Sequence, residues 1–340
     1  MQSATAPQHL IRLRDLPLQE LDLILERARS LKLRPSPNEF AGQTVGLLFF
    51  RGSLRTRISL EVAMHQLGGD TIELTASSDF WDLEDREGAV MDGRAPEHIK
   101  DAAAVLSRYV DALAVRTAPG ARSWDIDRRD DEIATWARFA TVPVINMESA
   151  LWHPLQALAD RMTLKEEFAE TAGKRVAVVW THSPEPATSA VTHSLLDMAL
   201  RDRMNVSVAH PPGYELDSGV MRELEELASK QGCEFQTGLT KEEAVEGADV
   251  VYARSWQSLE TYGNPTLTAS RRSRTLDWKV DGKLLDLGNS ARFMHAMPVR
   301  RNIEVSDEVL DSPQSLVYTQ AENRLHAQKA LLLHMLKKQA

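Results

Sequence analysis

The sequence has 340 residues, of which 43% are hydrophobic and 26% are charged, a composition typical of globular proteins. Because this length exceeds one ordinary compact core, we expect two domains. The formal net charge of -9 disfavours a nonspecific nucleic-acid binder, whose contacts with phosphates need a basic surface.

The first half of the chain alternates helical and strand patterns. Apolar residues recur at helical spacing from Leu16 to Leu31, and Val45–Phe50 is a continuous apolar run typical of a buried strand. A second helix is expected from about Leu54 to Gln66. Further strands are expected at Thr71–Leu74, Ala112–Val115 and Thr141–Ile145.

The same alternation begins again near Lys174. Amphipathic segments, among them a solvated helix over Met221–Lys230, separate the next apolar runs, and a last helix is expected over Glu322–Lys338. The expected strands are Arg175–Trp180, Asn205–Ala209 and Asp249–Ala253. The pattern predicts an α/β protein with two doubly wound parallel-sheet domains.

A polar and basic pentapeptide follows the predicted strand that ends at Phe50: Ser53-Leu54-Arg55-Thr56-Arg57. It opens the next helix, where free backbone N–H groups and the positive end of the helix dipole favour a phosphate. The two hydroxyl groups add donors, and the two arginines add charge. The alternative interpretation is an ordinary serine N-cap followed by two exposed arginines.

A second candidate is the turn His153-Pro154-Leu155-Gln156, which presents an imidazole and an amide from the start of a helix. A single histidine is more often structural than catalytic, so this motif needs partners. The candidate cationic partners are Arg116, Arg300, Arg301 and Arg324.

Taken in this order, these motifs resemble the aspartate and ornithine carbamoyltransferase superfamily. The resemblance continues through the run Phe293–Asn302 and through Glu322-Asn323-Arg324. It is strongest to the N-acetylornithine and N-succinylornithine carbamoyltransferases, through Phe80-Trp81, Val90–Gly93, Asn146–Glu148 and Val251–Trp256. Pro96 and the spacing from Glu148 to His153 are more similar to the succinyl branch than to the acetyl branch.

The resemblance implies a domain for carbamoyl phosphate over residues 1–150 and a domain for the amino substrate over residues 151–320. A C-terminal helix over residues 321–340 would return to the first domain. The resemblance also implies a knotted backbone in the second domain, an exception among folds. It further implies a homotrimer with shared active sites, in which Trp81 reaches a neighbouring subunit's site.

The residue roles also come from the resemblance. Catalysis is assigned to Arg55, Thr56 and His153. Carbamoyl phosphate binding is assigned to Ser53, Leu54, Arg55, Thr56, Arg57, Trp81, Arg116, His153, Gln156 and Arg324. Binding of the amino substrate is assigned to Glu148, His193, Arg254, Arg292, Ala296 and Met297. The chemistry requires no metal and no cofactor, and the histidines show no recognisable zinc spacing.

Several positions depart from the family pattern. Arg51-Gly52 replaces an Asn-Pro-like entry to the phosphate loop, and Ala296 stands where cysteine is common. In the amine-binding region the departures are Ser183, His193 and Arg254, which stand where histidine, asparagine and lysine are usual. These differences leave three hypotheses open: an N-acylornithine carbamoyltransferase of arginine biosynthesis with N-succinyl-L-ornithine preferred, a carbamoyltransferase for another amine, and a catalytically impaired regulatory protein that binds carbamoyl phosphate.

The expected location is the cytoplasm. Cys233 is the single cysteine and cannot form an internal disulfide, and the first residues lack the pattern of a secretory signal. No apolar stretch is long enough to span a bilayer, so no membrane partner is expected.

Overall fold

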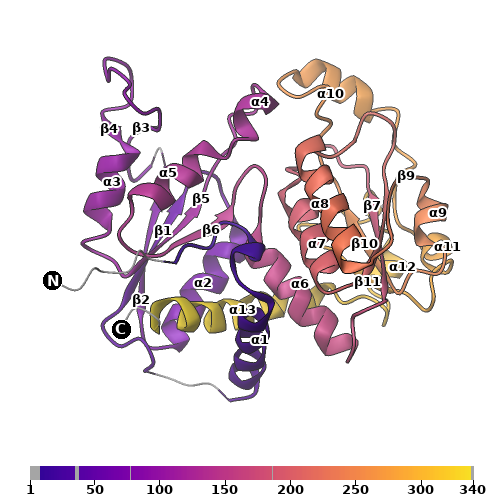
Figure 1. Cartoon of the computed structure of the whole chain (residues 1–340). Coiled ribbons are helices and arrows are strands. Elements are labelled where there is room, and N and C mark those ends of the chain that lie inside the picture. The colour runs from indigo at the N-terminus through magenta and orange to yellow at the C-terminus, as the bar shows by residue number, and fades with distance from the viewer. Residues whose placement is uncertain (1–7, 35–37, 77, 186, 338–340) are drawn as a thin grey trace. The chain divides into compact units, whose positions relative to one another are not determined.

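The computed structural model describes residues 8–34, 38–76, 78–185 and 187–337. The chain divides into two compact units, and each contains its own parallel sheet (Figure 1). The first unit comprises the residues up to Pro119, Asp127–Leu155 and the residues from Arg324 onward; the second comprises Gly120–Ile126 and Gln156–Asn323. The predicted α/β class with parallel sheets is therefore confirmed.

The first unit begins with a short 3-10 helix at Leu13–Asp15. Its helices are α1 (Leu18–Leu33), α2 (Leu54–Gln66), α3 (Ile99–Leu106) and α5 (Asp131–Phe139). Its strands are β1 (Thr44–Phe49), β2 (Asp70–Thr75), β3 (Leu83–Glu84), β4 (Glu97–His98), β5 (Ala112–Arg116) and β6 (Val144–Glu148). Three further helices have residues in both units: α4 (Trp124–Asp127), α6 (Pro154–Glu167) and α13 (Val317–Lys337).

The sheet of the first unit has the strand order β2-β1-β5-β6, and all its neighbours are parallel. Helices α3 and α5 pack on one face, where Ile99 and Trp136 are buried against Leu48 and Leu113 (Figure 1). Each of these side chains is at most 2% exposed, so their burial supplies a hydrophobic core.

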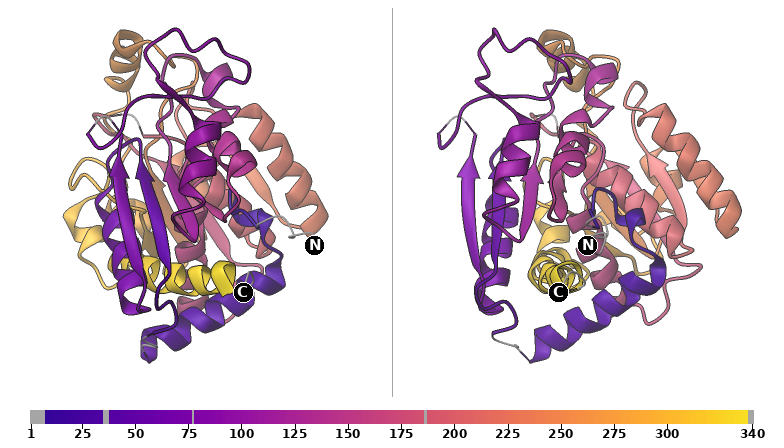
Figure 2. Two further views of the ribbon diagram at one scale, coloured as in Figure 1. Left: turned by 90° about the vertical axis from the view of Figure 1, so that its left-hand side faces the viewer. Right: turned by 60° about the vertical axis from the view of Figure 1, so that its left-hand side comes forward.

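The C-terminal part of α13 belongs to the first unit. His334 Nε2 lies 2.8 Å from Glu20 Oε2 of α1, and Figure 2 shows α1 and α13 side by side. Lys329 Nζ donates to Gln66 Oε1 at the end of α2 at 2.9 Å. The last helix therefore closes the first unit against helices from the start of the chain.

The second unit contains a five-stranded parallel sheet in the order β11-β10-β7-β8-β9. Its strands are β7 (Arg175–Trp180), β8 (Asn205–Ala209), β9 (Phe235–Leu239), β10 (Val250–Arg254) and β11 (Arg292–Met294). Its helices are α7 (Ala190–Arg201), α8 (Ser218–Gln231), α9 (Lys241–Val245), α10 (Pro265–Arg272), α11 (Gly282–Leu285) and α12 (Asp307–Leu310). The core on one face joins strand residues such as Val179 and Val251 to Val245 and Leu285 from helices.

Most of the elements expected from the sequence are confirmed. The main difference in the first unit is at β6, which begins at Val144 rather than Thr141, because Pro143 has no N–H to donate to the ladder. Strands β9 and β11 were not predicted; β9 is largely exposed and β11 is short, so neither has a strong apolar pattern. The last helix begins at Val317, earlier than expected, and the predicted end at Lys338 lies outside the described residues.

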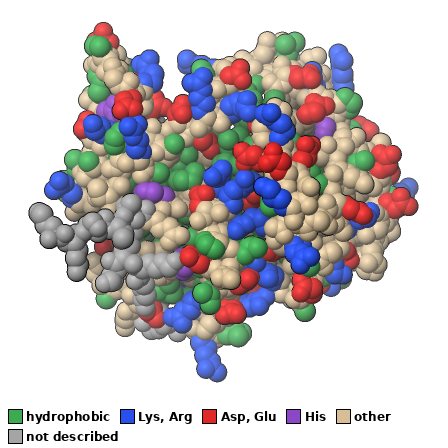
Figure 3. Space-filling view, viewed as in Figure 1, with side chains coloured by type: hydrophobic (Ala, Val, Ile, Leu, Met, Phe, Trp, Pro, Cys, Tyr) green, Lys and Arg blue, Asp and Glu red, His purple; other side chains and the backbone are tan. Residues whose placement is uncertain are grey.

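Acidic and basic side chains are interspersed over the face shown in Figure 3. Within the described residues, no helix combines the length and apolar character needed to cross a membrane.

Candidate active site

The register of the first sheet brings distant residues together at its carboxyl edge. Phe49 at the end of β1 pairs with Arg116 at the end of β5, and Arg116 pairs with Glu148 at the end of β6. The register between β5 and β6 shifts after Val115, so that Glu148 rather than Met147 lies opposite Arg116. Such irregularities redirect side chains, and here the shift matches a carboxylate to a guanidinium group.

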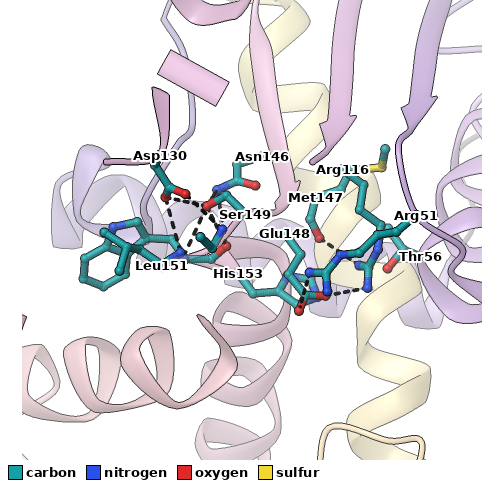
Figure 4. A network of polar contacts seen from close by, with 12 residues as sticks. Arg51, Thr56, Arg116, Asp130, Asn146, Met147, Glu148, Ser149, Leu151 and His153 are labelled. Atoms are coloured by element: carbon teal, nitrogen blue, oxygen red, sulfur yellow. Dashed lines mark hydrogen bonds and ion pairs between the residues drawn. The ribbon is translucent and has the colours of Figure 1, made fainter. Parts of the chain in front are cut away.

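Glu148 is the centre of a buried ion-pair network (Figure 4). Its Oε1 lies 2.8 Å from Nη2 of Arg51, and its Oε2 lies 2.5 Å from Nη2 of Arg116. The Nε2 atom of His153 is 3.8 Å from the same Oε2. The side chains of Glu148 and His153 are only 6% and 4% exposed, so the Glu148 carboxylate interacts with the two guanidinium groups with little screening by water.

The start of α2 lies in the same unit as the Glu148 network. We call the residues around Glu148 and the start of α2 the first half-site. Ser53 is the N-cap, and its hydroxyl accepts a hydrogen bond from the Thr56 N–H at 3.3 Å. Thr56 is buried, and its hydroxyl accepts a hydrogen bond from Nη2 of Arg324 at 2.8 Å. Arg55 is half-buried in the first turn. A helix N-terminus that carries these cationic groups is suited to bind a phosphate.

The surroundings of His153 favour its neutral form. Burial is the largest cause that lowers its pKa well below the ordinary value, and the nearby Arg324, Arg116 and Arg51 lower it further, whereas Glu148 opposes them. A neutral imidazole offers one N–H donor, which suits stabilisation of a developing oxyanion.

The turn between Glu148 and His153 is fastened by Asp130 (Figure 4). The Asp130 carboxylate accepts hydrogen bonds from the Ser149 hydroxyl at 2.7 Å and from the Ala150 N–H at 2.9 Å. Asp130 itself has a φ of 52°, in the left-handed region. Such backbone strain in a non-glycine residue is characteristic of functional regions, and here it directs the carboxylate towards the turn.

The Asp130 carboxylate should make stability depend on pH. Burial raises the pKa of Asp130 to about 6. Because the folded pKa exceeds the unfolded one, the stability contribution of this group is present at low pH and is lost as the pH rises through about 6. The original chain should therefore lose about 1 kcal/mol of unfolding free energy from this group between about pH 5 and about pH 7.5. Asp130→Asn removes the titrating group and should not show this loss.

Urea unfolding of both proteins at the two pH values measures this change. Asp101→Asn at an exposed position of the same unit is the control, and an equal pH dependence in both variants would contradict the assignment to Asp130.

Three of the residues predicted to bind carbamoyl phosphate are exposed or pair with other side chains. Arg57 turns towards β2, where it pairs with Glu73 at 2.5 Å and donates to the Thr75 hydroxyl at 3.1 Å. Leu54 is 67% exposed at the first position of α2. Trp81 is 57% exposed, and its Nε1 donates to Glu97 Oε2 at 2.8 Å.

In the second unit, Gln156 belongs to a buried polar network centred on Asp160 of α6. Gln156 Nε2 donates to Asp160 Oδ1 at 2.8 Å, and the Tyr252 hydroxyl donates to Oδ2 at 3.0 Å. Gln320 Nε2 also donates to Asp160 Oδ1, at 2.6 Å, and Gln320 Oε1 accepts from the His295 N–H at 3.0 Å. The network therefore connects the start of α6 to the segment that follows β11.

The segment after β11 forms a turn that contains Ala296 and Met297. His295 Nδ1 accepts a hydrogen bond from the Met297 N–H at 2.9 Å, and His295 Nε2 lies 3.2 Å from Glu304 Oε2. Hydrogen bonding from His295 and from the backbone of Arg300 lowers the pKa of Glu304, although burial opposes the shift. Glu304 thus holds the imidazole that braces the turn, while Ala296 leaves the turn without a thiol at that position.

The remaining acceptor candidates lie in different places. His193 is fully buried on α7, and Arg254 ends β10 at the carboxyl edge of the second sheet. Arg292 begins β11 at the opposite edge, where its Nε pairs with Glu167 at 2.6 Å and its Nη1 donates to the Pro313 carbonyl at 3.2 Å. Arg292 and Arg254 thus lie at opposite edges of the second sheet, and the role of Arg292 in binding the acceptor stays a prediction.

Sequence reasoning missed several residues that support the first half-site or the polar network and turn of the second unit. They are Arg51, Asp130, Asp160, Glu304 and Gln320. The position of Arg51 beside the phosphate loop was a usable signal, since an extra arginine there adds charge. The other four are single polar residues far in sequence from their partners, and no spacing rule identifies them.

No cluster of three metal-ligating side chains occurs among the residues that the structure describes.

Two family models together match most of the chain. The model for the carbamoyl-P binding domain of aspartate/ornithine carbamoyltransferase matches residues 8–166, and the model for its Asp/Orn binding domain matches residues 172–335. N-acetylornithine carbamoyltransferase of Xanthomonas campestris pv. campestris is 38% identical over 328 residues, 96% of each chain. Ornithine carbamoyltransferase of Hyperthermus butylicus is 38% identical over 329 residues, 95% of each chain.

Solved structures that are similar to this chain have the same kind of name as its sequence relatives. Acetylornithine transcarbamylase complexed with acetylcitrulline superposes with a TM-score of 0.92 at 38% identity, over 96% of this chain and 98% of that chain. A mutant of N-acetyl-L-ornithine transcarbamylase complexed with carbamyl phosphate and N-succinyl-L-norvaline gives the same TM-score of 0.92, identity of 38% and coverage of 96% and 98%.

Proposed function

The chain belongs to the aspartate/ornithine carbamoyltransferase family, and on that premise we propose that it transfers the carbamoyl group of carbamoyl phosphate to the side-chain amine of an N-acylated ornithine. The observation that carries this proposal is the convergence of Arg116, Glu148 and His153 at the sheet edge of the first unit. There, cations and a neutral donor surround a carboxylate beside the Ser53-capped helix.

The reaction needs a neutral amine to attack the carbonyl carbon, an oxyanion to be stabilised and phosphate to leave. Arg55, Thr56 and Arg116 bind the phosphate, and Ser53 holds the start of the helix that presents them. His153 donates to the carbonyl oxygen as its negative charge develops, and Arg55 and Thr56 assist. Holding the two substrates together supplies a proximity advantage.

The acceptor is assigned to residues of the second unit and to Glu148. Arg254 suits a carboxylate of the acceptor, because its planar guanidinium group offers paired donors. Backbone carbonyls around Ala296 and Met297 accept hydrogen bonds from the amine or the carbamoyl amide, and Gln156 orients that amide. Glu148 accepts a hydrogen bond from the amino substrate. His193 completes the acceptor site.

Within the acylornithines we propose N-succinyl-L-ornithine ahead of N-acetyl-L-ornithine. The support is Pro96, the spacing from Glu148 to His153 and the arginine at position 254, which can pair with a second carboxylate. A related enzyme mutant was crystallised with N-succinyl-L-norvaline, which indicates that this architecture accommodates a succinyl group.

The wider biological setting is also part of the proposal. We propose a homotrimer in the cytoplasm that acts in arginine biosynthesis, with a knotted backbone in the second domain and with Trp81 contributing to a neighbouring subunit's site. The 57% exposure of Trp81 supports its proposed contact with a neighbouring subunit, because tryptophan is enriched at protein interfaces.

A purified-protein assay tests the function. Carbamoyl phosphate is supplied with ornithine, N-acetylornithine, N-succinylornithine, putrescine or aspartate, and both phosphate release and the carbamoylated product are measured. We expect phosphate release that depends on an acylornithine and is greatest with N-succinylornithine. Turnover with another amine would replace the proposed acceptor, and binding of carbamoyl phosphate without turnover across the panel would overturn the enzymatic proposal.

A further inference from the structure

Arg51 adds a cation to the first half-site, close in sequence to the helix start at Ser53. It lies two residues after the end of β1, and its Nη2 contacts Glu148 Oε1 at 2.8 Å. Its side chain is 27% exposed, whereas that of Arg116 is 11% exposed. The two arginines therefore approach one carboxylate from the rim and from the interior of the half-site.

The two oxygens of Glu148 are divided between the two guanidinium groups. Oε1 faces Arg51, and Oε2 faces Arg116 and lies 3.8 Å from His153 Nε2. Both arginines and Arg324 also lower the pKa of His153. The Glu148 carboxylate thus engages two guanidinium groups that can also bind an anion with more oxygens and more charge.

We propose that Arg51 and Arg116 form a clamp of two guanidinium groups for the phosphoryl group of carbamoyl phosphate, and that the Glu148 carboxylate competes for this clamp. The identity of the anion rests on the proposed function. The clamp itself rests on the two contacts with Glu148.

Charge and geometry explain the competition. Guanidinium groups bind carboxylates and phosphates with the same paired N–H donors, so each anion can replace the other. A carboxylate and a phosphate dianion repel each other strongly at contact distance in a buried site, so both cannot occupy the clamp. When the phosphoryl group binds, Glu148 must turn away from Arg116, and its carboxylate then becomes available to the amine of the second substrate.

The binding of inorganic phosphate to the full chain tests the clamp. Isothermal titration calorimetry at fixed pH and ionic strength compares the original chain with Glu148→Gln, Arg51→Met and the double variant. We expect Glu148→Gln to bind phosphate about 10-fold tighter, because the competing charge is removed. The double variant should bind phosphate about 10-fold more weakly than Glu148→Gln, since the clamp loses one guanidinium group.

Arg138→Met is the matched control, because it removes an arginine of the same unit that pairs with Glu87 at the surface, 61% exposed. It should leave phosphate affinity unchanged. If Glu148→Gln unfolds, Glu148→Ala serves in its place, and the rise in melting temperature caused by phosphate gives a second measure of affinity.

The results of the phosphate titrations distinguish the clamp from the proposed carbamoyl transfer. Unchanged or weaker phosphate binding in Glu148→Gln would overturn the competition, and an Arg51→Met substitution without effect in the Glu148→Gln background would overturn the role of Arg51. Tighter phosphate binding by Glu148→Gln in a chain that carbamoylates none of the amines would support the clamp and reject the proposed reaction.

Discussion

Replacing His153 by alanine should lower kcat by about 100-fold to 1,000-fold, the typical effect of losing one oxyanion donor. The imidazole is buried, and this burial lowers its pKa, which favours the neutral donor that the proposed role requires. His153→Gln retains an N–H donor and should recover part of the loss. Steady-state kinetics with carbamoyl phosphate and the preferred acylornithine measure the effect.

Two controls distinguish catalysis from folding. His65→Ala changes an exposed histidine on α2 and should leave kcat within about twofold of the original value, since surface substitutions have small effects. Inorganic phosphate should still bind to His153→Ala, because Arg55 and Arg116 remain. Near-normal turnover by His153→Ala would reject its assignment as the oxyanion donor.

Replacing Asp160 by alanine should destabilise the second unit by about 3 kcal/mol or more. Asp160 is fully buried and accepts hydrogen bonds from Gln156, Tyr252 and Gln320. Alanine leaves these buried donors without their acceptor, and each unsatisfied donor carries a desolvation cost. Burial raises the pKa of Tyr252 well above its ordinary value, so its hydroxyl remains a donor at physiological pH.

Denaturant unfolding followed by circular dichroism measures this loss. Asp160→Asn keeps the shape and one carbonyl acceptor, so it should lose less stability than alanine. Asp286→Ala removes an exposed carboxylate of the same unit and should change the unfolding free energy by less than about 0.5 kcal/mol. A loss from Asp160→Ala as small as that of Asp286→Ala would show that the network does not stabilise the fold.

The Glu148 network and the Asp160 network each centre on a buried carboxylate, but the groups that contact the two carboxylates differ. In the first unit the Glu148 carboxylate is paired with two guanidinium groups, and in the second the Asp160 carboxylate accepts hydrogen bonds from the neutral groups of Gln156 and Tyr252. Guanidinium groups that bind a carboxylate can bind another anion in its place, whereas neutral donors attract a second anion less strongly. We therefore expect the first network to respond to phosphate and the second to remain a rigid support.

The sequence by itself determined the local elements and the main motifs. Mostly apolar runs located strands such as β7 and β8, because a parallel strand that is buried on both faces is rich in apolar side chains. The placement of Ser53 and Arg55 at the start of a helix also followed from local pattern, since an N-cap depends on neighbours within one turn. The family resemblance added roles to residues that spacing alone could not interpret.

Only the tertiary structure decided which of the candidate side chains meet. Arg324 and Thr56 are 268 residues apart in the chain and share a hydrogen bond, and a register shift of one residue sets Glu148 against Arg116. The same structure shows that Arg57 pairs with Glu73 and Arg292 with Glu167, two contacts that the sequence did not predict. Strand register and ion-pair choice depend on contacts between distant segments, and local propensity carries no information about them.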